Sequence, residues 1–345
     1  MKFKEAVTYD DMLMVPQYSS ITSRSEVDIS STLGHERVLE LPILASPMDT
    51  ISEEGMAVAM SNAGGMAILH RYNTIEDQVK MAHCAIQKTD WTGNIAAAIG
   101  VTDDYMKRAE ALISVGIDTL CVDVAHGHHI LMKTALENLR KEYDNHIHIM
   151  AGNVCTLEGV NDLADWGANS VRCNIGGGSI CSTRLVTGHG LPGLQTIFDC
   201  ARTDRDVAII ADGGIKTSGD IVKALAAGAD FVMCGSLFAG ADETPGSIVH
   251  LQSGEIAKEY RGMASRNAQM DWRGKSSSPE GVSSYVPYKG SIDHILENIT
   301  GGIKSGFSYS GARNLTELRH KVEWARQTSA GTKESETHIA ERSVR

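Results

Sequence analysis

The residues best suited to chemistry lie in one short segment, 176–184, which reads GGGSICSTR. It places a single thiol, Cys181, among three glycines and the hydroxyl side chains of Ser179, Ser182 and Thr183. Glycine allows backbone conformations and a close ligand approach that other residues obstruct. Hydroxyl groups can bind an oxyanion or relay a proton. Because such a loop offers little apolar packing, Cys181 is a candidate nucleophile.

The other cysteines and the histidines predict no disulfide framework and no metal centre. The chain has seven cysteines, an odd number, and no CxxC pair. Cys121, Cys173 and Cys234 lie inside apolar runs, where cysteine behaves as a small hydrophobe. We therefore expect these three to be buried. The HGHH segment at 126–129 has no identifiable carboxylate or sulfur partners, so we expect solvent exposure or cofactor contact there.

Composition and charge exclude several classes of protein. The 43 acidic and 32 basic residues give a net charge of −11, and no basic run is long enough to track phosphates. Nucleic acids and anionic membranes are therefore disfavoured as partners. No uncharged apolar stretch approaches about eighteen residues, and the N-terminus lacks a signal-peptide pattern. We expect a soluble, cytoplasmic protein.

Eight short apolar runs predict the elements that position the candidate nucleophile. The runs begin at Leu41, Met66, Ile95, Thr119, Ile147, Ser170, Val207 and Asp230. Several intervals between them hold amphipathic helix patterns that end in glycine. Continuous apolar strands that alternate with helices indicate a parallel sheet covered on both faces. Eight such units in 345 residues favour a (β/α)8 TIM barrel. The alternative is an open doubly wound sheet, but no GxGxxG follows the first strand.

Polar or glycine-rich groups follow nearly every predicted strand, where barrel enzymes carry their active residues. These groups are Ser46–Asp49, His70–Arg71, Gly100, Asp123–Gly127, Gly152–Asn153, the Cys181 loop, Asp212–Gly214 and Gly235–Ser236. The last two follow strands seven and eight, where barrels commonly bind phosphate. We therefore expect a phosphorylated ligand, and we assign no role to His70–Arg71.

Several segments, in order along the chain, resemble one known family. They are YDDMLMVPQYSS, SPMDT, AGNV, GGGSICSTR, IIADGGIKTSGDIVKALAAGADFVMCGS, YRGMAS and GGIKSGFSYSGA. Together they are similar to the inosine monophosphate (IMP) dehydrogenase and guanosine monophosphate (GMP) reductase superfamily. The resemblance implies a barrel domain over residues 1–312 with an active-site flap at about 264–286. The polar, charged segment 313–345 predicts a C-terminal helix and a mobile tail.

The resemblance also implies roles for individual residues. Cys181 would attack C2 of the purine to give a covalent thioimidate, with Thr183 and Glu280 as a proton relay. The carbonyls of Gly176, Gly178 and Cys181 would bind K+. Substrate contacts would come from Ser46, Met48, Ser179, Asp212, Gly213, Gly214, Gly235, Ser236, Tyr260, Gly262 and Met263. Cofactor contacts would come from Asp123, Ala125 and Asn153. The family's barrels form tetramers, which implies a homotetramer here.

The two activities of the superfamily share the covalent intermediate and differ afterwards. The dehydrogenase oxidises IMP with NAD and hydrolyses the thioimidate, using an Arg-Tyr pair in its flap to activate water. The reductase expels ammonia from GMP and receives a hydride from NADPH, giving IMP. Residues 265–279 here contain no Arg-Tyr dipeptide and no tyrosine. The chain also lacks the inserted regulatory repeats that dehydrogenases usually carry, and its TGHG resembles the reductases' TGVG.

These features predict a GMP reductase that uses NADPH. SPMDT and VDVAHGH are more typical of dehydrogenases, so an IMP dehydrogenase without regulatory repeats and with a substitute water activator stays open. A third alternative is a regulatory protein that binds purine nucleotides without turnover. The complete set of Cys181, Thr183 and Glu280 counts against it, because binding alone requires none of the three.

Overall fold

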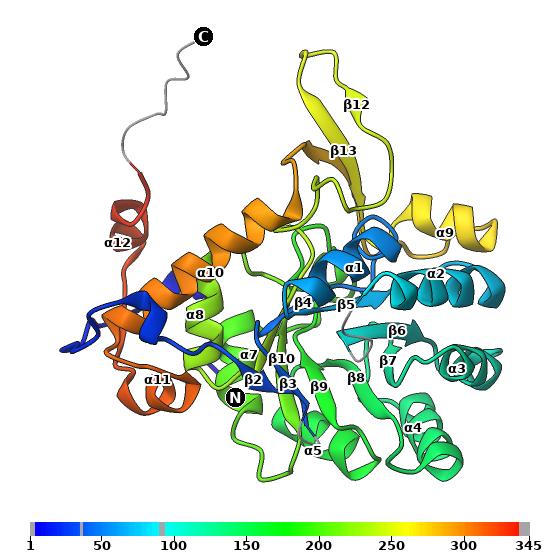
Figure 1. Cartoon of the computed structure of the whole chain (residues 1–345), viewed down its shortest axis with the longest axis horizontal. Helices are drawn as coiled ribbons and strands as arrows, with labels where there is room; N and C mark the ends of the chain where they lie inside the picture. The colour runs from blue at the N-terminus through cyan, green and yellow to red at the C-terminus, as the bar shows by residue number, and fades with distance from the viewer. Residues whose placement is uncertain (1–3, 35–36, 90–93, 338–345) are drawn as a thin grey trace.

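Eight parallel strands close into a barrel in the computed structural model, which describes residues 4–34, 37–89 and 94–337 (Figure 1). The strands are β4 (Ile43–Ala45), β5 (Met66–Leu69), β6 (Ile95–Ile99), β7 (Thr119–Asp123), β8 (His148–Val154), β9 (Ser170–Cys173), β10 (Ala208–Asp212) and β11 (Phe231–Cys234). Each strand pairs with the next, and β11 pairs with β4 to close the ring. The predicted (β/α)8 barrel is confirmed, and the open sheet is excluded.

Helices cover the outside of the barrel. They are α1 (Glu54–Asn62), α2 (Ile75–Gln87), α3 (Tyr105–Ser114), α4 (Ile130–Tyr143), α5 (Leu157–Asp165), α7 (Gly193–Cys200), α8 (Ser218–Ala226) and α10 (Ile292–Tyr309). The short helix α6 (Thr183–Thr187) buries no side chain and follows the Cys181 loop. Helix α8 shows how such helices begin, because Thr217 and Asp220 cap its first turn reciprocally. The predicted glycine ends are confirmed for α1, α3 and α8, since Gly64, Gly116 and Gly228 have φ of +78°, +102° and +115°.

The side chains of the barrel strands alternate between two cores. In β5, Met66 and Ile68 belong to a cluster inside the barrel, whereas Ala67 and Leu69 belong to the layer between strands and helices. Within the described ranges, no helix is both long and apolar enough to cross a membrane.

Small additional elements cover the two ends of the barrel. The hairpin of β2 (Ser31–Thr32) and β3 (Val38–Leu39) adds Leu33 and Leu39 to the interior cluster. At the opposite end, β12 (Val249–His250), β13 (Ile256–Arg261) and β14 (Ser283–Pro287) form a sheet that projects from the barrel (Figure 1). Helix α9 (Arg266–Arg273) lies between β13 and β14, inside the predicted flap.

The two ends of the chain pair with each other. Strand β1 (Met12–Met14), which follows the turn η1 (Tyr9–Asp11), is antiparallel to β15 (Trp324–Arg326). A second turn, η2 (Arg24–Glu26), precedes β2. The predicted C-terminal helix corresponds to α11 (Leu315–Lys321), and α12 (Ser329–Glu334) follows β15. The predicted tail thus contains regular structure up to Glu334, while residues 338–345 lie outside the described ranges and its mobility stays a prediction.

Candidate active site

One cavity of about 270 Å³ at the carboxyl ends of the strands brings all the predicted site residues together. Its lining includes Ser46, Met48, Asp123, Ala125, Asn153, Gly176, Gly178, Ser179, Cys181, Thr183, Asp212, Gly213, Gly214, Gly235, Ser236, Tyr260, Gly262, Met263 and Glu280. These residues come from the ends of β4, β7, β8, β9, β10 and β11, from β13 and the residues just after it, and from the flap.

The thiol of Cys181 begins a chain of hydrogen bonds that ends on a carboxylate. Cys181 is exposed, and its Sγ donates to Thr183 Oγ1 at 3.2 Å. Thr183 Oγ1 in turn donates to Glu280 Oε2 at 2.8 Å. A proton that leaves the thiol therefore has a continuous path to the carboxylate, as general acid–base chemistry requires.

Backbone hydrogen bonds hold Glu280 beside the nucleophile loop. The amide of Ser182 donates to the Glu280 carbonyl at 2.9 Å, and the Glu280 amide donates to the Ala264 carbonyl at 3.0 Å. The amide of Val282 donates to the Ile180 carbonyl at 3.0 Å. The second half of the flap is thus paired with the loop that carries Cys181, and this pairing fixes the carboxylate near the thiol.

Glycines let two loops approach closely at the end of the cavity where the sequence predicts a phosphate group. Gly213 and Gly214 have φ of +80° and +76°, a region that favours glycine. A Cβ on Gly213 would lie 3.3 Å from the Gly178 backbone, and one on Gly214 would lie 3.2 Å from the Gly177 carbonyl oxygen. Any side chain here would push apart the end of β10 and the nucleophile loop.

The residues predicted to contact substrate converge around Gly235. A Cβ on Gly235 would lie 2.9 Å from Tyr260 Oη, 3.2 Å from Met48 Sδ and 3.5 Å from Ser46 Oγ. Burial raises the pKa of Tyr260 to about 12, although a hydrogen bond with Ser179 opposes the shift. The phenol therefore keeps its proton and remains a hydrogen-bond donor at neutral pH.

A buried arginine that the sequence reasoning did not identify connects the two halves of the cavity. Arg172, on β9, is 6% exposed. It donates to Asp123 Oδ1 at 2.5 Å and to Asp212 Oδ2 at 2.8 Å. Asn153 Nδ2 also donates to Asp212 Oδ2, at 2.7 Å. Burial opposes the charge of Arg172, but the two carboxylates outweigh it and raise its pKa. The charged residue inside the apolar run SVRCN was the available signal.

Replacing Arg172 with methionine is expected to lower the free energy of unfolding by about 3 kcal/mol, because the carboxylates of Asp123 and Asp212 lose their shared cation. Urea unfolding followed by circular dichroism measures this. The control is Arg205→Met, which removes the exposed pair with Asp165 and should leave the unfolding midpoint nearly unchanged. Equal midpoints for the two variants would contradict a central role for Arg172.

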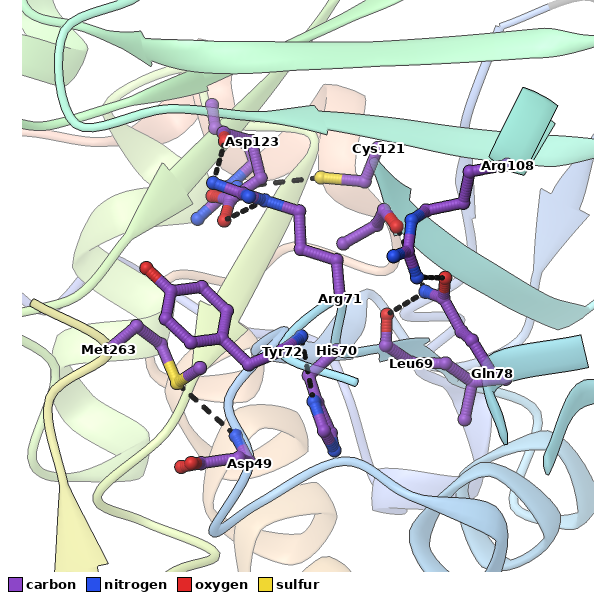
Figure 2. Close-up of polar contacts among 12 residues, drawn as sticks. Asp49, Leu69, His70, Arg71, Tyr72, Gln78, Arg108, Cys121, Asp123 and Met263 are labelled. Carbon is purple, nitrogen blue, oxygen red and sulfur yellow. Dashed lines mark hydrogen bonds and ion pairs between the residues drawn. The ribbon is translucent and has the colours of Figure 1, made fainter. Parts of the chain in front are cut away.

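In the segment His70–Tyr72, which follows β5, the first residue is buried in the fold and the other two face the cavity. His70 is buried; its Nε2 contacts Glu53 Oε1 at 3.0 Å, and its Nδ1 accepts the Tyr72 amide at 3.2 Å. Arg71 and Tyr72 line the cavity. Arg71 Nη2 donates to the Asp123 carbonyl at 3.0 Å (Figure 2). The sequence signal for Arg71 was its position directly after a predicted strand. Tyr72 was not singled out from the sequence.

The seven cysteines comprise four buried thiols, two half-buried thiols (Cys84 and Cys155) and one exposed thiol, Cys181. The prediction that Cys121, Cys173 and Cys234 are buried is confirmed. Burial raises the pKa of the Cys121 thiol to about 12, and it also raises the pKa values of Cys173 and Cys234. These thiols therefore hold almost no thiolate at pH 8, whereas Cys181 is exposed beside a hydroxyl and a carboxylate.

Iodoacetamide at pH 8 is expected to modify Cys181 at least about tenfold faster than any buried cysteine, because alkylation needs both access and thiolate. Peptide mass spectrometry over a time course gives the rate at each position. Faster labelling of Cys121 or Cys234 than of Cys181 would contradict this view of the loop.

The side chains of the histidine segment 126–129 are either exposed or engaged in hydrogen bonds. His128 Nε2 contacts Asp162 Oδ2 at 2.8 Å, and His129 Nδ1 caps the start of α4. His126 is exposed, and partial burial together with the neighbouring histidines lowers its pKa. In the ranges that the structure describes, no group of three or more His, Cys, Asp or Glu residues is arranged to hold a metal ion.

Two of the three predicted K+ ligands, Gly178 and Cys181, are the first and last residues of one tight turn. The Cys181 amide donates to the Gly178 carbonyl at 3.1 Å, so residues 178–181 fold back on themselves. Arg184 donates to the Ile175 carbonyl at 3.0 Å and also to the Leu191 carbonyl, which braces the loop from the other side. Neutral carbonyl oxygens are the donors that K+ prefers, so the donor type fits the predicted cation.

A closed parallel barrel whose strand ends hold an exposed thiol and a hydroxyl–carboxylate relay is typical of a barrel enzyme with a cysteine nucleophile. The model of the IMP dehydrogenase / GMP reductase domain matches residues 6–338. The chain therefore belongs to the IMP dehydrogenase / GMP reductase family. This is a family of oxidoreductases of purine nucleotide metabolism that use nicotinamide cofactors.

Individual relatives carry both names. Inosine-5'-monophosphate dehydrogenase of Nitrosopumilus maritimus is 31% identical, over 98% of this chain and 99% of that protein. GMP reductase of Leishmania donovani is also 31% identical, over 97% of each. Among solved structures, a cysteine-to-alanine variant of GMP reductase from Trypanosoma brucei, in complex with guanosine 5'-monophosphate, is similar with a TM-score of 0.91. It is 30% identical, and the match covers 98% of this chain and 99% of that one.

The comparisons weaken one argument made from the sequence. The alignments with the dehydrogenase and the reductase span 473 and 477 positions, well beyond the 345 residues of this chain. Relatives of both names therefore contain residues that have no counterpart here. Lack of an insertion does not separate the two activities, so the choice between them depends on the flap and the site.

Proposed function

We propose that the protein is a GMP reductase, which converts GMP, NADPH and a proton into IMP, ammonia and NADP+ through a covalent Cys181 thioimidate. The observation that carries this proposal is the path from the Cys181 thiol through Thr183 to the Glu280 carboxylate. It occurs beside a flap whose residues 265–279 include no tyrosine to activate water.

The relay provides both proton transfers that deamination needs. As Cys181 Sγ bonds to C2 of the purine, the thiol proton passes through Thr183 to Glu280. The same pair then protonates the departing amine, because ammonia leaves readily and an amide anion does not. The C2–N bond breaks and the thioimidate remains on Cys181. The bound nicotinamide would supply a hydride to C2, after which the C–S bond breaks and IMP leaves.

The cavity offers separate groups for the parts of a purine nucleotide. The 5'-phosphate is assigned to the amides of Gly214, Gly235 and Ser236, with hydroxyl donors from Ser179 and Tyr260. The protonated phenol of Tyr260 suits that role, because an ionised tyrosine would repel phosphate.

The remaining assignments follow from position in the same cavity. Asp212 is assigned to the ribose hydroxyls, Met48 to one side of the base, and the backbones of Gly262 and Met263 to its edge. Asp123, Ala125 and Asn153 are assigned to the nicotinamide. Residues Ser46 and Gly213 complete the wall. A bound K+ on the loop carbonyls, assembly as a homotetramer and a cytoplasmic location belong to the same proposal.

The second candidate is IMP dehydrogenase, and one observation favours it. An Arg-Tyr pair, Arg71–Tyr72, lines the cavity from β5 instead of from the flap. Burial raises the pKa of Tyr72, although the neighbouring charge of Arg71 opposes this. The phenol therefore stays protonated at neutral pH and is poorly suited to take a proton from water. GMP reduction therefore remains the favoured activity.

Two parallel assays with K+ present test the proposal. One contains GMP with NADPH, and the other contains IMP with NAD. A fall in the absorbance of the reduced nicotinamide in the first, with one ammonia released per NADPH, is the expected result. A rise in the second alone would establish the dehydrogenase. If both stay silent while GMP binds, the protein is a nucleotide-binding regulator.

A further inference from the structure

Tyr72 occupies a place in the cavity that none of the roles assigned for GMP reduction uses. Its ring extends from the end of β5 toward Met263 and Asp123 (Figure 2). Tyr72 therefore lies where the base edge of the substrate half meets the cofactor half.

The position of the Tyr72 ring is set by its neighbours. The Arg71 guanidinium carbon lies 5.4 Å from the ring centroid, which is cation–π range. Arg71 is itself held by the carbonyl of Asp123, and its Nε lies 3.8 Å from Asp123 Oδ2. That Nε is buried and makes no hydrogen bond to any described residue. A buried N–H without an acceptor beside a cavity indicates a ligand that supplies one.

The flap brings a second aromatic ring against Tyr72. The ring centroid of Trp272, on α9, lies 6.0 Å from that of Tyr72, at an interplanar angle of 41°. Because the rings are tilted, they do not cover each other, and Trp272 is 39% exposed. Aromatic side chains that leave a face open commonly bind the planar rings of ligands.

Ion pairs fix α9 in this position. Arg261 donates to Asp271 Oδ2, next to Trp272, at 2.5 Å, and to Asp49 Oδ2 at 2.7 Å. The Asp49 amide contacts Met263 Sδ at 3.3 Å. The flap helix is therefore tied to the end of β4 and to the base edge of the cavity. Arg273 adds positive charge near Tyr72, which suits an anionic ligand.

We propose that Tyr72 and Trp272 form an aromatic clamp, two adjoining rings against whose open faces the nicotinamide dinucleotide packs, with Arg71 supplying a donor to it, so that cofactor binding requires the flap helix in place. The inference rests on the proposed function and adds residues that determine cofactor affinity. The ligand is a dinucleotide because the clamp continues the Asp123 side of the cavity, and because it combines aromatic faces with positive charge.

The test compares variants of Trp272 by titrating NADPH into the intact protein and following nicotinamide fluorescence, with GMP affinity measured separately by calorimetry. Trp272→Ala is expected to weaken NADPH binding by about tenfold or more. Trp272→Phe keeps a ring and should lose less than about threefold. The matched control is Met270→Ala, which shortens another exposed side chain of α9 and should leave NADPH affinity unchanged. GMP affinity should stay the same in all three.

Tyr72→Ala and the double variant with Trp272→Ala complete the design. If the two rings act as one clamp, the double variant will lose less NADPH affinity than the two single losses combined predict. Wild-type NADPH affinity in Trp272→Ala would overturn the inference. An equal loss of GMP and NADPH affinity would also overturn it, because the contact between the rings would then only hold the flap in place. If the wild-type protein binds GMP but no dinucleotide, the proposed function itself fails and the clamp fails with it.

Discussion

Replacing Cys181 with alanine is expected to reduce kcat for GMP reduction by at least about 10⁴-fold, because the covalent path through C2 is lost. GMP affinity should change little, since the proposed phosphate contacts lie on the loops around Gly214 and Gly235. Stability should also be retained, because Cys181 is exposed and belongs to neither apolar cluster. Single-turnover kinetics and GMP calorimetry on the same preparation measure both effects.

A matched control is available in Cys84→Ala, which removes a half-buried thiol from α2, away from the cavity. It should keep full activity. Mass spectrometry of the denatured wild-type protein during turnover should also show an adduct on the peptide that contains Cys181. Retained turnover in Cys181→Ala would remove the covalent mechanism and, with it, the main reason for assigning the loop to catalysis.

Glu280→Gln is expected to lower kcat by about 10²- to 10⁴-fold, within the range of general acid–base catalysis. Glutamine preserves the size of the side chain and the backbone bonds to Ser182 and Ala264. It removes the carboxylate that accepts the Thr183 hydroxyl proton at 2.8 Å. Ammonia release should therefore slow while GMP affinity is kept. Rapid-quench measurement of ammonia gives this rate directly.

Thr183→Val tests the same relay from its middle, because it interrupts the path and leaves the carboxylate in place. It should slow ammonia release by a comparable factor. Glu297→Gln, on the exposed side of α10, is the control and should have no effect. Normal ammonia release in Glu280→Gln would mean that the carboxylate only anchors the flap.

The barrel could be predicted from the sequence because its strands are buried on both faces and read as short apolar runs. Runs such as IAAAI and AIIAD correspond to β6 and β10. Most site residues could be predicted for a related reason. In a closed parallel sheet all strands end at the same side, so polar groups after the runs must converge. Residues as distant as Ser46 and Gly235 therefore line one cavity. Tyr260, Gly262, Met263 and Glu280 follow no barrel strand, and only the family resemblance pointed to them.

The residues that the sequence reasoning missed depend on contacts between distant segments. The role of Arg172 depends on the neighbours of β9, because its partners Asp123 and Asp212 end other strands. The contact of Tyr72 with Trp272 joins β5 to the flap across 200 residues of sequence. No local pattern encodes such a meeting. The pairing of β1 with β15 is another example, since short strands at the two ends of the chain carry no periodic signal.

Isotope transfer tests the central claim most directly. The protein is incubated with GMP and NADPH carrying deuterium at both C4 positions, in water enriched in ¹⁸O, and the nucleotide product is analysed by mass spectrometry. The account predicts IMP with one deuterium at C2, no ¹⁸O and one ammonia per turnover. A dehydrogenase would instead convert IMP and NAD in the same water into xanthosine monophosphate with ¹⁸O at C2. That product, with no deuterium transfer to GMP-derived IMP, would contradict the account.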